Sequence, residues 1–76
     1  MKTYVRFEEF GESASGLTKI WMVKNSNSNF TVGRVKWQAT WRKYIFEPAP
    51  NCIFDTNCLS EIVQFVESRM EAHNAR

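Results

Sequence analysis

Residues 35–46, VKWQATWRKYIF, decide the fold that this sequence predicts. Two runs of strand-forming residues flank Ala39-Thr40, an arrangement that is typical of a β-hairpin. Because side chains alternate along a strand, a two-residue turn at Ala39-Thr40 gives one face of the hairpin an apolar set. That set consists of Val35, Trp37, Tyr44 and Phe46. We expect it to form part of the core.

The register of this hairpin has two readings. A two-residue turn pairs Gln38 with Trp41, and Trp41 then lies on the face opposite the apolar set. A three-residue loop pairs Trp37 with Trp41 and brings both rings to one face, since a shift of one residue moves a side chain across the sheet. Ala-Thr is poor chemistry for a two-residue turn, which prefers Asn-Gly. We favour the two-residue register because it gives a clean apolar face.

Downstream of the hairpin the pattern changes from strand to helix. Pro48 and Pro50 cannot donate to a sheet ladder, so they end the last strand. The apolar positions then recur at helical spacing. These positions are Leu59, Ile62, Val63, Val66 and Met70, with Phe65 at one margin. The spacing predicts a helix over 58–71, capped by Asp55, Thr56 or Asn57, with residues 72–76 frayed.

Upstream of the hairpin the sequence predicts two more strands. A polar turn, GESASG at 11–16, and an Asn/Ser loop, NSNSN at 25–29, separate the expected strands. All connections are short, so an antiparallel meander is the simplest topology. The expected strands span residues 3–10, 17–24, 30–37 and 41–47. The sequence therefore predicts a single α+β domain over 1–76: a four-stranded antiparallel meander with one C-terminal helix on one face (ββββα).

Length and composition limit the class of protein. A chain of 76 residues makes one domain, and 43% hydrophobic with 14% aromatic residues indicates a folded chain. No apolar run approaches the ~18 residues of a membrane span, and the N-terminus lacks a signal-peptide core. We therefore expect a cytoplasmic protein with no membrane partner. Cys52 and Cys58, the only cysteines, are expected to be free thiols.

The net charge of +2 conceals an uneven distribution of charge along the chain. Between Ser13 and Phe46 there is no acidic residue, and six residues are basic: Lys19, Lys24, Arg34, Lys36, Arg42 and Lys43. A folded molecule with one basic face suits an anionic partner. The alternative is a chance distribution in which glutamates keep an exposed helix face soluble.

Four residues of this segment are the candidate ligand-binding residues. In the favoured register, the face opposite the apolar set carries Arg34, Lys36, Trp41 and Lys43. The cations would neutralise phosphates, and the exposed ring would stack on a base. The alternative for Trp41 is a ring that covers the outer face of the sheet, stacked on an Arg or Lys stem.

The residues typical of catalytic and metal sites are scarce. His73 is the only histidine, and the spacing of Cys52 and Cys58 matches no common zinc pattern. The glycines are isolated, so there is no phosphate-binding glycine loop. We expect a protein that is not an enzyme and that uses no metal and no cofactor.

Residues 33–68 resemble a recurrent family of small, mostly uncharacterised phage, prophage and bacterial proteins. The resemblance rests on a Gly-x-x-Lys-Trp-x-x-x-Trp-Arg-x-Tyr-x-Phe-x-Pro hairpin followed by a Phe and a Cys-Leu-x-x-Ile-x-x-Phe helix. The matching positions are Gly33, Lys36, Trp37, Trp41, Arg42, Tyr44, Phe46, Pro48, Phe54, Cys58, Leu59, Ile62 and Phe65. The resemblance implies a phage-encoded accessory protein and brings no functional residue with it.

The sequence is compatible with three functions. The favoured one is a binding module for nucleic acid or a nucleotide, acting through a basic, Trp-containing sheet face. The alternative is an inhibitor or adaptor that binds a host protein through a sheet edge or through the acidic helix face with Glu61, Glu67 and Glu71. The third is a homodimer joined through the outer face of the sheet.

Overall fold

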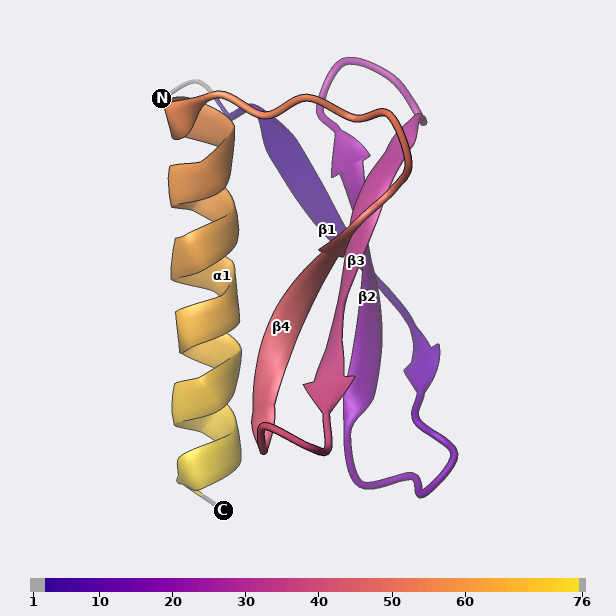
Figure 1. The fold of residues 1–76 in the computed structure, drawn as a ribbon, viewed down its shortest axis with the longest axis vertical. Coiled ribbons are helices and arrows are strands. Elements are labelled where there is room, and N and C mark those ends of the chain that lie inside the picture. Colours follow the sequence, from indigo (N-terminus) through magenta and orange to yellow (C-terminus); the bar gives the residue numbers. More distant parts are fainter. Residues whose placement is uncertain (1–2, 76) are drawn as a thin grey trace.

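The computed structural model describes residues 3–75. One antiparallel sheet has the strand order β1-β2-β3-β4, and a single helix follows it. The elements are β1 (Val5–Glu12), β2 (Lys19–Asn25), β3 (Thr31–Gln38), β4 (Lys43–Pro48) and α1 (Thr56–Asn74). Figure 1 shows α1 alongside the sheet, with its last turns at the end where β1 joins β2 and β3 joins β4. The predicted ββββα meander is confirmed.

The helix begins at its predicted cap and ends later than expected. The Asp55 side chain accepts a hydrogen bond from the Cys58 amide at 2.9 Å, which satisfies one free donor of the first turn. That bond also lowers the pKa of the Asp55 carboxyl. The prediction that the chain frays from residue 72 is wrong, since the helix continues to Asn74. The His73 ring packs on Trp37, with centroids 4.5 Å apart, and holds the last turn in place. Arg76 lies outside the described residues.

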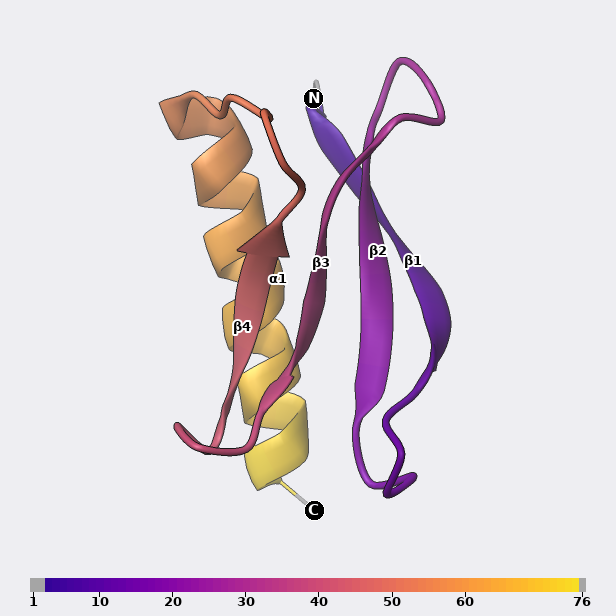
Figure 2. The same ribbon diagram turned by 45° about the vertical axis from the view of Figure 1, so that its right-hand side comes forward.

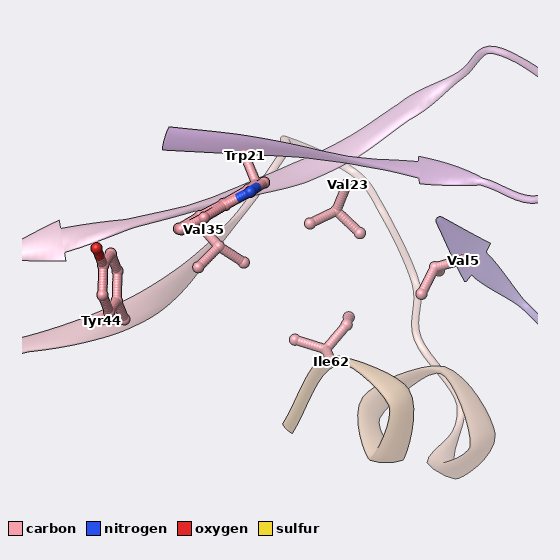
Figure 3. Close-up of a cluster of buried hydrophobic side chains, with 6 residues drawn as sticks. All are labelled: Val5, Trp21, Val23, Val35, Tyr44 and Ile62. Carbon is pink, nitrogen blue, oxygen red and sulfur yellow. The ribbon is translucent and has the colours of Figure 1, made fainter. Parts of the chain in front are cut away.

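The core lies between the helix and one face of the sheet, and all four strands contribute to it. Figure 3 shows its six buried side chains, Val5, Trp21, Val23, Val35, Tyr44 and Ile62. Phe65 joins the layers, since it stacks on Phe7 at 4.0 Å and meets the edge of Trp21 at 5.4 Å. Leu59 and Val63, at 43% and 51% exposed, lie outside this contact, so the buried stripe of the helix is narrower than the sequence pattern indicates.

The predicted hairpin register is wrong by two residues, while its core face is right. Trp37 pairs with Tyr44 and Gln38 with Lys43, which leaves a four-residue loop at 39–42. The amides of Trp41 and Arg42 both donate to the Gln38 carbonyl, at 3.2 and 2.8 Å, so the loop closes as a compact turn outside the ladder. A shift of two residues preserves the faces. The apolar set therefore faces the core, and Trp41 leaves the sheet.

One carboxylate of α1 binds the main chain at the start of β1. Glu61 accepts hydrogen bonds from the main-chain amides of Tyr4 and Val5, at 3.0 Å each. Val5 begins the edge strand β1 and Tyr4 precedes it, and within residues 3–75 no strand pairs with the outer edge of β1 to supply acceptors. Figure 2 shows the start of α1 and the start of β1 at the same end of the molecule. Glu61 is therefore a structural residue and not part of a free acidic helix face.

Glu61→Ala is expected to lower the free energy of unfolding by about 1.5 kcal/mol, a value typical of hydrogen bonds to a charged group. Urea denaturation measures the change. Glu67→Ala is the matched control, because Glu67 is exposed on the same helix and such surface changes usually stay within about 0.5 kcal/mol. Equal stability of the two variants would contradict the assigned role of Glu61.

Candidate functional site

Two of the candidate residues, Arg34 and Lys36, share one acidic partner. They lie on the outer face of β3, the face turned away from the helix, and Glu47 stands opposite Arg34 on β4. Arg34 Nε pairs with one carboxylate oxygen of Glu47, and Lys36 Nζ lies 3.8 Å from the other. The Arg34 hydrogen bond, with the charges of Arg34 and Lys36, lowers the pKa of the Glu47 carboxyl. These two cations are therefore partly neutralised.

Cross-strand pairing also brings acids back to the lysines of β2. Lys24 Nζ lies 3.2 Å from Glu8, and Lys19 Nζ lies 3.4 Å from Glu9. Hydrogen bonds from Arg6 and Lys24 lower the pKa of Glu8. The basic residues of the 13–46 segment therefore do not form one uniformly basic face. Most of them pair with acids that β1 and Glu47 supply from outside the segment.

The β3–β4 connection carries the remaining cations of that segment. We call Trp41, Arg42 and Lys43 the hairpin tip. All three are exposed, Trp41 at 63%. Within residues 3–75, neither Arg42 nor Lys43 forms an ion pair. The hairpin tip is therefore an exposed indole beside two cations that no acid in the described part of the chain neutralises.

The backbone of the hairpin tip is strained at Arg42. Arg42 has φ 57°, in the left-handed region that favours glycine. A non-glycine residue there costs on the order of 1 kcal/mol, and such strain concentrates at functional positions. Arg42 is thus held in a conformation that closes the turn.

The structure divides the four candidate residues into two groups. Trp41 and Lys43 belong to the hairpin tip, while Arg34 and Lys36 lie farther along the outer face with Glu47. Arg42 is the residue that sequence reasoning omitted from the site. Its signal was present, since Trp41, Arg42 and Lys43 are contiguous, but the assumed register placed Arg42 inside the ladder.

Among residues 3–75, no group of three or more His, Cys, Asp or Glu side chains is placed to hold a metal ion. In the described part of the chain, no helix combines the length and apolarity that a membrane crossing needs. Cys52 and Cys58 are free, as predicted, and burial, with Asp55 beside it, raises the pKa of the Cys58 thiol.

Comparisons with known proteins add no identity to this geometry: no protein-family model, curated protein or solved structure matches the chain.

Proposed function

We propose that this protein is a small non-enzymatic binding module for single-stranded nucleic acid or a nucleotide, with the hairpin tip as its contact surface. The observation that carries the proposal is the 63% exposed ring of Trp41 beside Arg42 and Lys43, two cations that pair with no acid among residues 3–75. Stacking of one base on an aromatic ring contributes about 1–3 kcal/mol. Arg42 and Lys43 would add phosphate contacts, which release counterions and make binding depend on salt.

The outer face of the sheet has a secondary part in this proposal. Lys36 lies 3.8 Å from Glu47, and an exposed pair at that distance contributes little to stability. A phosphate that follows the strand from the tip would therefore compete with Glu47 for Lys36 at small cost. Arg34 is held closer to Glu47 and contributes less to such a path.

The proposal includes a cytoplasmic location and a phage origin for the protein. Two free cysteines suit a reducing cytoplasm. The resemblance of residues 33–68 to small phage and prophage proteins supports a phage-encoded accessory role.

Phe10 supports a second candidate, an adaptor that binds a host protein. It lies at the bulge of the edge strand β1 and is 71% exposed. Bulges discourage the addition of another strand at an edge. A protein partner would therefore use the Phe10 ring as an anchor rather than extend the sheet.

The test of the proposal is an anisotropy titration of a labelled oligo-thymidine at two salt concentrations. Lys43→Ala should weaken binding and reduce the slope of log K against log salt by about 0.7, the value for one phosphate contact on a single strand. Trp41→Ala should cost about 1–3 kcal/mol of binding and leave the slope nearly unchanged.

Two further variants, a control and a second test of the hairpin tip, complete this titration. Lys24→Ala removes the same charge from a residue already paired with Glu8, and binding should change little. Arg42→Gly relieves the left-handed strain, so it should weaken binding without lowering the melting temperature. Undetectable binding at low salt, or equal losses in Lys24→Ala and Lys43→Ala, would reject the proposal and favour a protein partner.

A further inference from the structure

A pocket of about 370 Å³ opens where the last turns of α1 meet the β1–β2 connection. Figure 1 shows these segments at the same end of the molecule. Trp21 and Tyr44 line the pocket, and their rings meet edge to face with centroids 5.6 Å apart. The remaining lining is largely polar and includes Glu12, Arg69 and His73. Pockets of this size with aromatic walls and few converging polar groups are typical of small-molecule sites.

Arg69 is the group in the pocket wall that suits an anion. Its guanidinium carbon lies 5.6 Å from the Trp21 ring centroid and 5.4 Å from that of Phe65, so two aromatic rings hold it in place. Its Nε lies 3.3 Å from the Ser68 hydroxyl, and no acid in residues 3–75 pairs with it. A planar guanidinium with free N–H groups suits a carboxylate or phosphate.

His73 is a second polar residue of the pocket wall. It lines the same pocket, and its Nδ1 is buried with no hydrogen bond to the part of the chain described. Buried polar atoms nearly always have a partner. The imidazole therefore forms part of the pocket wall.

Two acids also line the pocket. Glu9 is paired with Lys19, whereas Glu12 forms no ion pair with any residue between 3 and 75. The pocket also adjoins the C-terminal end of α1, where the helix dipole is negative. A phosphate dianion would be repelled by both. A ligand that carries one carboxylate and one ammonium group matches Arg69 and Glu12 together.

We infer that this pocket binds a small amphoteric molecule of amino-acid size, with its carboxylate on Arg69, its ammonium group towards Glu12 and its apolar body against Trp21 and Tyr44. This inference does not depend on nucleic-acid binding at the hairpin tip.

Three probes that share a phenyl group test the inference by NMR: L-phenylalanine, 3-phenylpropanoate, which lacks the ammonium group, and 2-phenylethylamine, which lacks the carboxylate. The chain has one histidine, so its imidazole signals report on the pocket without further assignment. L-phenylalanine should shift these signals in a saturable manner. Each truncated probe should bind about tenfold more weakly, as expected for the loss of one contact to a charged group.

Glu12→Gln is the decisive variant, because Glu12 is exposed and its replacement leaves the fold intact. In this variant L-phenylalanine should bind no better than 3-phenylpropanoate. Arg69→Gln should weaken L-phenylalanine binding about tenfold, as the loss of the carboxylate from the probe does, and Glu71→Gln, an exposed change on the same helix, should leave it unchanged. Absence of saturable shifts with L-phenylalanine would overturn the inference. Equal affinity of the wild type for all three probes would also overturn it.

Discussion

Trp21→Ala is expected to lower the free energy of unfolding by about 3–5 kcal/mol. Trp21 is 8% exposed and contacts Tyr44, Phe65 and Arg69, so its removal leaves a cavity beneath the helix. A domain of this length has a total stability of about 4–11 kcal/mol. The variant should therefore be largely unfolded at moderate temperature, as measured by circular dichroism during thermal and urea denaturation.

The other two tryptophans provide matched controls. Trp41→Ala should keep the wild-type stability to within about 0.5 kcal/mol, because the ring is 63% exposed in a loop. Trp37 is half-buried between Tyr44 and His73, and its variant should fall between the two. A Trp41→Ala protein less stable than Trp21→Ala would show that the rings are wrongly placed.

Gly33→Ala is expected to destabilise the protein by about 1–3 kcal/mol, the usual cost of overpacking. Gly33 is buried on β3, and a Cβ there would lie 2.5 Å from carbons of the Phe46 ring and 2.6 Å from the main-chain oxygen of Glu47. The ring can rotate, but the main-chain oxygen belongs to the sheet ladder. The β3–β4 pairing must therefore shift to admit one methyl group.

Gly11→Ala is the control for this prediction. A Cβ at Gly11 meets no atom within 4 Å, so the substitution should change stability by no more than about 0.5 kcal/mol. Urea midpoints of the two variants give the comparison. A Gly33→Ala protein as stable as Gly11→Ala would contradict the close packing of Phe46 over β3.

The sequence predicted the topology because its local signals agreed. Alternating apolar residues gave the strands, Pro48 ended the last one, and the helical stripe gave α1 with its Asp55 cap. The end of the helix was missed because the contact of His73 with Trp37 is a tertiary one. Fraying is a reasonable expectation only where nothing packs on the last turn.

The candidate site was harder to predict because it depends on strand register. With a two-residue turn, Glu47 would stand opposite Val32, and Arg34 would have no acid across the ladder. The four-residue loop moves Glu47 opposite Arg34. The same shift takes Trp41 off the sheet. One local choice, whether Trp41 and Arg42 join the ladder, therefore decides which cations are neutralised and where the exposed ring lies.

The most direct test of hairpin-tip binding follows the three indole N–H signals by NMR during titration with oligo-thymidine, with each signal assigned by a Trp→Phe variant. The Trp41 signal should move most and saturate, and the buried Trp21 signal should remain in place. The proposal that the hairpin tip is the nucleic-acid contact would be contradicted if the Trp41 signal stayed in place while the Trp21 signal moved. It would also be contradicted if none of the three signals moved.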